Sequence, residues 1–374
     1  MTANLKIPVQ RTIAFSAVLG LILSLILFIP GNSSAKVTGL CVNCHTMHNS
    51  QDGGAMATYG GTSGENSCLT RGSCIGCHAY NKTGAASVVD VGGSQIPQVW
   101  HAGTDLAAGN FKYVDGADYG KGHNVTDFFG ADSDVDLNAA PGVQSGHESY
   151  LTDSTLKCAG DRGCHGIRDS DTGILALKGA HHGNVDGKCN DPTTVAKSYR
   201  FLSGVKGLEN TTDKWQNKDV TSHNEYFGAI TPMTEACLNC HDGGGGPVIS
   251  STNTISGFCG TCHGNFHFLA GIGGDTSSPF TRHPTDVDLP GGTTEFAAYT
   301  TYSVEAPVGR TTVPDTASGT VTPGGGTDVI TCLSCHGAHG TNYPDMLKWD
   351  YLTMNAGGGG SGGCFTCHTE KDNP

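Results

Sequence analysis

Cysteine and histidine recur in this sequence in a fixed order with a well-known chemical use. Six copies of Cys-x-x-Cys-His occur, namely CVNCH (41–45), CIGCH (74–78), CLNCH (237–241), CGTCH (259–263), CLSCH (332–336) and CFTCH (364–368). In such a pattern the two thiols add to the two vinyl groups of a haem, and the adjacent histidine binds the iron. The attaching cysteines are then Cys41, Cys44, Cys74, Cys77, Cys237, Cys240, Cys259, Cys262, Cys332, Cys335, Cys364 and Cys367. The first axial ligands are His45, His78, His241, His263, His336 and His368.

Two other uses of paired cysteines fit the pattern less well. Paired CxxC units form tetrahedral zinc sites, but zinc leaves the histidine after every second cysteine without a role. Disulfides suit an exported chain, but six bridges across two intervening residues are redox-active and strained rather than stabilising. We therefore interpret these six motifs as sites of covalent haem c attachment.

A seventh stretch, LKCAGDRGCHG (156–166), resembles the motif but has five residues between its cysteines. A longer loop between Cys158 and Cys164 still spans the same two vinyl groups if only the loop bulges, and Gly160 and Gly163 ease such a bulge. His165 then becomes a seventh first ligand. The alternative is six haems, with Cys158 in a disulfide and His165 as a second ligand.

Two further cysteines, Cys68 and Cys189, remain after seven haems are counted. In an exported protein two leftover thiols most simply pair with each other. The count therefore favours seven haems and one disulfide, although Cys68 also stands close to Cys74 in the sequence.

The histidine count predicts the second axial ligands. Seventeen histidines occur, so ten remain after the seven first ligands are set aside, whereas the chain has only six methionines including the first residue. Ten histidines are enough to give every haem a second histidine. Haems without a methionine ligand have low reduction potentials.

Composition predicts an irregular fold. Glycine makes up 56 of 374 residues, about twice the usual ~7%, and such a chain loses much backbone entropy on ordering. We expect a multihaem c-type cytochrome that is mostly coil, with a haem-stacked core. Short helical turns are expected after the attachment motifs, and short strands at 111–114 and 198–202. The net charge of −13 argues against a nucleic-acid partner, which needs a basic face.

The first 35 residues are predicted to be an export signal. Lys6 and Arg11 precede an apolar run from Ile13 to Ile29, and Ser33 and Ala35 stand at a plausible cleavage site. The alternative is an uncleaved membrane anchor, because the run is barely long enough to span a bilayer. Residues 36–374 are expected to form one multihaem domain with no membrane span after cleavage.

The chain resembles the extracellular multihaem cytochromes of metal-reducing bacteria that polymerise into filaments. The resemblance rests on CVNCHTMHNS (41–50), GKGHNV (120–125), YRFLSGVKG (199–207), RHPTD (282–286), CLSCHGAHGTNYPDMLKWD (332–350) and CFTCHTEKD (364–372). It implies stacked haems that conduct electrons along a continuous chain, with an extracellular or cell-surface location, or a periplasmic one. In the filament-forming members the second histidine of the first motif ligates a haem of the neighbouring subunit. That residue is His48 here.

The resemblance also assigns second ligands. His123, His267, His283 and His339 match family positions, and a histidine stands near the place of His101 in a six-haem relative. His182 in AHHG and His223 in SHNEY are assigned in the same way, whereas His147 and His181 are interpreted as ordinary polar residues. The chain departs from six-haem relatives at Cys158 and Cys164, where those relatives have the usual two-residue spacing.

Three functions are compatible with this pattern. The first is a filament subunit that carries electrons to other multihaem cytochromes or extracellular acceptors, with copies of itself as partners. The second is a periplasmic or cell-surface electron carrier that does not polymerise. The third is a multihaem reductase, which needs an iron with an open position, often marked by CxxCK. No such motif occurs in the sequence.

Overall fold

The computed structural model describes residues 39–51, 53–55, 66–79, 83–116, 118–129, 137–143, 148, 152, 155–168, 173–177, 199–231, 254–267, 275–277, 280–292 and 294–371. All of them belong to one unit, Lys36–Pro374. The predicted export signal, the motif at 237–241, His182 and Cys189 lie outside the described residues. Predictions that concern these segments stay predictions.

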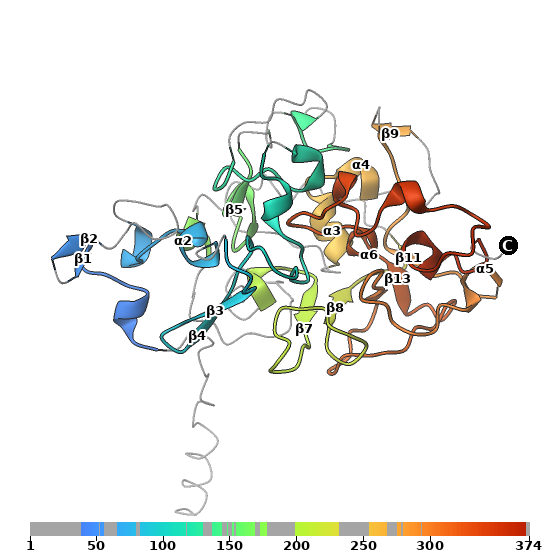
Figure 1. The fold of residues 1–374 in the computed structure, drawn as a ribbon. Helices are drawn as coiled ribbons and strands as arrows, with labels where there is room; N and C mark the ends of the chain where they lie inside the picture. Colours follow the sequence, from blue (N-terminus) through green and yellow to red (C-terminus); the bar gives the residue numbers. More distant parts are fainter. Residues whose placement is uncertain are drawn as a thin grey trace, which may run out of the picture. The chain divides into compact units, whose positions relative to one another are not determined.

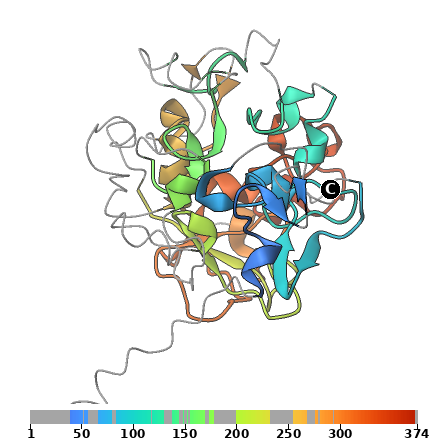
Figure 2. The same ribbon diagram turned by 90° about the vertical axis from the view of Figure 1, so that its left-hand side faces the viewer.

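Regular structure is sparse and short, as composition predicted, and long irregular segments join the elements (Figures 1 and 2). The described α-helices are α2 (Cys74–His78), α3 (Ile255–Gly260), α4 (Gly264–His267), α5 (Thr294–Ala297) and α6 (Cys332–Cys335). The 3₁₀ turns are η1 (Cys41–Asn43), η3 (Ser67–Leu69), η4 (Phe111–Tyr113), η5 (Tyr119–Lys121), η7 (Gly173–Leu177), η9 (Tyr199–Phe201), η10 (Pro344–Met346), η11 (Tyr351–Thr353) and η12 (Gly363–Thr366).

The strands are equally short. They are β1 (Ser50–Gln51), β2 (Gly54–Ala55), β3 (Val88–Val91), β4 (Ser94–Pro97), β5 (Lys157–Ala159), β6 (Gly163–His165), β7 (Val205–Gly207), β8 (Asn224–Phe227), β9 (Asp275–Ser277), β10 (Phe280–Thr281), β11 (Val287–Asp288), β12 (Gly309–Arg310) and β13 (Asp328–Ile330). Four pairs form two-stranded ribbons, and β5 and β6 are parallel. The remaining five form one sheet in the order β11-β13-β12-β8-β7, in which only β12 and β8 run parallel.

Both predicted strands were wrong. Residues 111–114 begin with the 3₁₀ turn η4, because the Asn110 side chain accepts a hydrogen bond from the Lys112 amide and because Phe111 and Val114 are buried at a helical spacing of three. At 198–202, Arg200 and Phe201 have φ angles of 60° and 53°, which no strand contains. The helical turns agree with expectation at α4, which directly follows the motif at 259–263, whereas α2, α6, η1 and η12 lie essentially within motifs.

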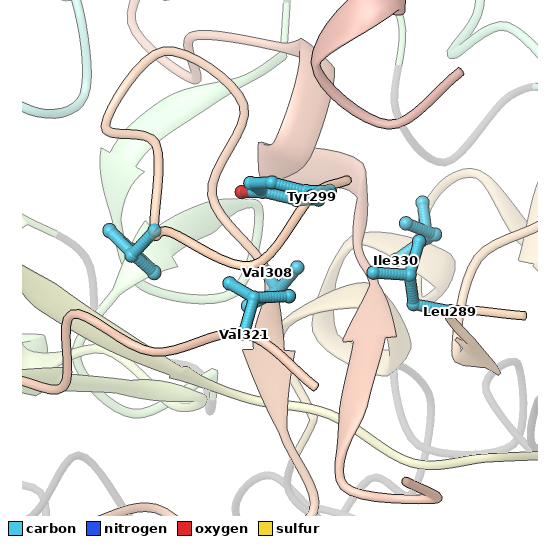
Figure 3. Close-up of a cluster of buried hydrophobic side chains, with 6 residues drawn as sticks. Leu289, Tyr299, Val308, Val321 and Ile330 are labelled. Carbon is cyan, nitrogen blue, oxygen red and sulfur yellow. The ribbon is translucent and has the colours of Figure 1, made fainter. Parts of the chain in front are cut away.

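The five-stranded sheet carries a core of ordinary side chains, which composition did not predict. Leu289, Tyr299, Tyr302, Val308, Val321 and Ile330 form one buried cluster, and Figure 3 shows five of them labelled around β13 and the start of β12. A second cluster contains Trp100, Phe111 and Val114. Each buried aliphatic or aromatic side chain contributes about 1.5–3 kcal/mol. In this region side chains therefore form a core of their own, in addition to the haem-stacked core that the sequence predicts.

A buried ionic network links three strands of the same sheet. Arg310 on β12 donates from Nε to Glu225 on β8 at 3.1 Å and from Nη1 to Asp328 on β13. Its Nη2 donates to the carbonyl of Ser318 at 3.1 Å. Glu225 and Asp328 are almost fully buried, so their charges are compensated by this one guanidinium.

Replacing Arg310 with methionine is expected to destabilise the protein by about 3–5 kcal/mol, because two buried carboxylates lose their compensating charge. Urea unfolding of the haem-loaded protein, followed by circular dichroism, measures the loss. Lys206→Met is the matched control, since Lys206 pairs with the fully exposed Asp315 and such pairs contribute little. Equal unfolding midpoints for the two variants would contradict the assignment.

Candidate haem-binding sites

Each described Cys-x-x-Cys-His motif closes a single helical turn on itself. The histidine amide donates to the carbonyl of the first cysteine in the motifs at 41–45, 259–263, 332–336 and 364–368, at 2.8–3.0 Å, and the motif at 74–78 is the helix α2. Residues three apart lie on the same face of a helical turn. Both thiols are thereby presented on one side, which is the arrangement that attachment to two vinyl groups requires.

The described motif histidines share a second feature, which is an anchored Nδ1. In five motifs the anchor is a main-chain carbonyl, namely that of Cys68 for His45, Pro97 for His78, Arg200 for His165, Pro141 for His263 and Asp345 for His336. For His368 the anchor is the Glu295 carboxylate. The distance from Nδ1 to the anchoring oxygen is 2.7–3.0 Å in all six. A carbonyl oxygen only accepts, so Nδ1 must carry the proton. The lone pair of Nε2 is then available, as in metal-ligating histidines generally.

Burial keeps several of these imidazoles neutral. Desolvation is the largest cause that lowers the pKa of His78, His165 and His336. It also lowers the pKa of His263 to about 4, with the charge of His123 as the next cause. The neutral imidazole is the form that binds a metal ion.

Three motif histidines each face a predicted second ligand. Ring centres are 6.1 Å apart for His123 and His263, 6.2 Å for His165 and His339, and 6.3 Å for His283 and His368. Imidazole nitrogens lie about 2.0–2.1 Å from a bound metal ion, so two rings on opposite sides of one iron have centres about 6 Å apart. Each pair has the spacing of an axial ligand pair, and each contains one motif histidine and one histidine from another part of the chain.

Two of the second ligands in these pairs are held by distant segments, and the third is held by its neighbour in the sequence. His123 Nδ1 is anchored on the carbonyl of Ala338 at 2.6 Å, next to His339 in the sequence. The ring of His339 stacks on Phe111 at 4.7 Å between ring centres. His283 Nδ1 lies 2.9 Å from the Pro284 carbonyl.

The cysteines of successive motifs lie close enough to influence each other's ionisation. Burial and then Cys44 raise the pKa of Cys77 to about 11, so the first two motifs are neighbours. Cys335 has its pKa raised to about 12 by burial, with a further contribution from Cys364. The other neighbouring pairs are Cys74 with Cys158, Cys164 with Cys259, and Cys259 with Cys332. Each of the six described motifs therefore has a cysteine whose ionisation is coupled to a cysteine of another motif.

The widened motif adopts a local structure suited to its longer loop. β5 and β6 pair in parallel with Lys157 opposite Gly163 and Ala159 opposite His165. Gly160 has a φ of 104°, and a Cβ at Gly163 would lie 2.5 Å from the Ala159 backbone, so both glycines are needed for the bulge. No disulfide joins Cys158 to Cys164.

His101 is placed as a ligand would be. Its side chain is fully buried, and both ring nitrogens are without a hydrogen-bond partner among the described residues. An unpartnered buried polar group is costly, and an iron ion bound to one nitrogen would remove that cost at that nitrogen. The main chain of His101 is fixed by the buried Asn110 side chain.

Two other predicted ligands have Nε2 directed at a carboxylate. His223 lies 3.1 Å from Glu225 and stacks on Tyr302, and His267 lies 3.0 Å from the buried Asp286. In this structure neither presents a free Nε2. Among the described residues, the Nδ1 of His267 has no hydrogen-bond partner. Their roles as ligands stay predictions, as do those of His182 and of the motif at 237–241.

The described residues fit haem better than zinc. No group of three or more His, Cys, Asp or Glu side chains in this part of the chain is arranged to hold a metal ion. The residues instead supply paired thiols, a neutral histidine with an anchored Nδ1, and a facing histidine, which is the donor set of a bis-histidine haem c. Within the described segments no helix is long and apolar enough to cross a membrane.

Sequence reasoning missed the groups that orient the ligands. Glu295 on α5 holds His368, and the remaining anchors are main-chain carbonyls. The anchoring carbonyls of Pro141 and Arg200 are 122 and 35 residues from the histidines they hold. No local pattern in the sequence indicates such contacts.

Comparisons with known proteins agree with this chemistry. Residues 325–373 match the family model described as "Doubled CXXCH motif". The chain is similar to the C-type cytochrome OmcS of Geobacter sulfurreducens, at 24% identity over 386 aligned positions that cover 86% of this chain and 82% of that protein. Among solved structures it is similar to the outer membrane cytochrome S filament of the same organism, with 21% identity, 86% of each chain covered and a TM-score of 0.44. A cryo-EM structure of the OmcS nanowires gives 20% identity, 84% of each chain and a TM-score of 0.39.

The curated relative and the family model together support an OmcS-like multihaem cytochrome. This confirms the resemblance that the motifs predicted. It also agrees with the short helices, short strands and predominant coil of the chain.

Proposed function

We propose that this OmcS-like chain is an electron-transfer protein, not an enzyme, and that it is the subunit of an extracellular cytochrome filament. It carries electrons through a continuous series of bis-histidine haems c. The observation that carries the proposal is the pairing of histidines, since three motif histidines each face a second histidine with ring centres 6.1–6.3 Å apart. Two histidines on one iron leave no position open for a substrate, which suits electron transfer.

The chain's own residues position and insulate the electron path. When bound, haem supplies a one-electron couple at each site. The cysteines fix each macrocycle to a helical turn, and anchored histidines such as His165 and His263 hold the ligand rings in one orientation. Burial of the facing rings excludes water, so little solvent has to reorganise when an electron moves.

His48 is proposed to connect one subunit to the next. It stands three residues after His45, in the left-handed region with a φ of 58°, and it is exposed. Its neighbour Met47 is also exposed, at 69%. An exposed imidazole beyond the first attachment turn is free to enter the site of another copy, as it does in the filament-forming cytochromes that the motifs resemble.

The two other functions make different demands. A carrier that does not polymerise needs the same haems but has no use for an exposed ligand at His48. A reductase needs an iron whose second position is open to substrate. The three facing histidine pairs occupy that position at the sites of His165, His263 and His368, which favours electron transfer over catalysis.

Electron paramagnetic resonance of the oxidised protein tests the proposal. We expect low-spin signals, because two histidines on one iron give a strong ligand field. His339→Ala, which removes the ring facing His165, is expected to convert one site to high spin, and His147→Ala is the matched control. A substantial high-spin signal in the unaltered protein would favour the reductase instead.

A further inference from the structure

Two oppositely charged side chains lie at consecutive junctions between attachment motifs. The first is Arg71, between the motifs at 41–45 and 74–78. The second is Asp127, between the motif at 74–78 and the widened motif at 158–165. Their charges have no part in attaching haem or in binding iron as derived above.

Arg71 is fixed against the first motif. Its amide donates to the Cys44 carbonyl at 2.8 Å, and its Nη1 donates to the Asn43 carbonyl at 3.4 Å. The positive charge therefore lies beside the first attachment motif.

Asp127 is fixed against the widened motif. Its Oδ2 accepts a hydrogen bond from the Cys158 amide at 3.0 Å, and the adjacent Thr126 is bonded to the Leu156 carbonyl through both its amide and its hydroxyl. After burial, Asp127 is the largest cause that raises the pKa of both Cys74 and Cys158. The negative charge therefore lies at the next junction along the chain.

Neither charge is neutralised by an ion pair within the described segments. Arg71 Nε is buried and has no hydrogen-bond partner there. Reduction of a ferric haem adds one negative charge, so a nearby cation favours it and a nearby anion opposes it. In a partly buried site such an effect is screened less than at the surface.

We propose that Arg71 and Asp127 grade the reduction potentials of the first three sites, with Arg71 raising the potential near the first motif and Asp127 lowering it at the second and third. The proposal rests on the proposed function, because it requires haem at these motifs. An electron then leaves a ferrous haem at the second or third site, which becomes ferric, and reduces the ferric haem of the first. No bond is made or broken, and no proton moves.

Within one subunit the first site is then the most easily reduced of the three. Arg168 adds a positive charge on the other side of the widened motif, where its Nε donates to the Gly163 carbonyl at 2.9 Å. It remains in place in every variant proposed below. The effects of Arg71 and Asp127 are therefore measured as differences against a constant background.

Spectroelectrochemical titration of the haem-loaded protein tests the proposal. Asp127→Asn keeps an oxygen to accept from the Cys158 amide but removes the charge, and it is expected to favour reduction of the affected haems about tenfold, which is 59 mV for one electron. Arg71→Gln is expected to shift a subset of haems by a similar amount in the opposite direction. Asp127→Glu, Arg71→Lys and the exposed Asp115→Asn are expected to leave the titration unchanged.

The haem count of each variant, from intact mass, separates the possible failures. The grading proposal is overturned if Asp127→Asn and Arg71→Gln keep all their haems and their titrations superimpose on that of the unaltered protein. The proposed function is not affected by that result. Absence of haem from the unaltered protein overturns the proposed function itself. If Asp127→Asn alone loses a haem, the proposal is tested by comparing the redox titration of Arg71→Gln with that of Arg71→Lys. Equal titrations of these two variants overturn the proposal.

Discussion

The mature, non-reduced protein is expected to have the mass of the polypeptide plus seven haems, with two further thiols oxidised. The seventh haem is expected at the widened motif, because His165 shares the anchored Nδ1 of the other motif histidines and also faces a second histidine. Its Nδ1 is anchored at 2.7 Å on the Arg200 carbonyl, and its ring faces His339 at the spacing of an axial pair. Intact-mass spectrometry counts haems and thiols in one measurement.

A double substitution tests this assignment. Replacing Cys158 and Cys164 with serine is expected to remove one haem mass and leave six, since the two thioether bonds are the only covalent links to that macrocycle. Cys68→Ser is the matched control and is expected to keep all seven. A count of six in the unaltered protein, unchanged by the double substitution, would make Cys158 and Cys164 structural and free His165 as a second ligand.

His48→Ala is expected to convert filaments into monomers. If His48 completes the coordination of iron in the neighbouring subunit, its loss removes a metal-ligand bond from every contact along the filament. Negative-stain electron microscopy and size-exclusion chromatography measure the change. The acceptor haem in the monomer is expected to become high spin, which links the loss of assembly to the loss of a ligand.

Met47→Ala provides the control for this substitution. Met47 is adjacent to His48 and is 69% exposed. Replacing it with alanine therefore removes apolar contact area without removing a ligand. Filaments are expected to persist in this variant. Unchanged assembly of His48→Ala would exclude the ligand role, and equal disassembly of both variants would attribute the contact to apolar packing instead.

The chemistry of this chain was predictable because it is encoded locally. Two thiols and a histidine within five residues determine a site without reference to the rest of the fold, and the helical turn that presents them is closed by their own backbone. The composition was equally informative, since a chain so rich in glycine forms only short elements. The family resemblance followed from the same short motifs.

The parts that sequence reasoning missed depend on contacts between distant residues. β8, β12 and β13 are two to four residues long, and β8 is separated from β12 by about eighty residues, so no alternating pattern marks the sheet. The strand predicted at 111–114 was wrong because Asn110 caps a 3₁₀ turn there. The carbonyl that anchors His123 belongs to Ala338, 215 residues away, and no local pattern predicts it.

The sheet with its own side-chain core has a consequence for maturation. Around β8, β12 and β13 the interior consists of tyrosine, valine, leucine and isoleucine, together with the Arg310 network, and none of these groups requires a porphyrin. The cluster that contains Trp100, Phe111 and Val114 likewise packs against Ile75 and Cys158, which belong to the second and third motifs. Both clusters can therefore order before any haem is attached, and the attachment machinery would meet cysteines that are already held on partly folded scaffolds. Insertion of the macrocycles completes the folding of the segments around them, so cofactor loading and folding become one process there.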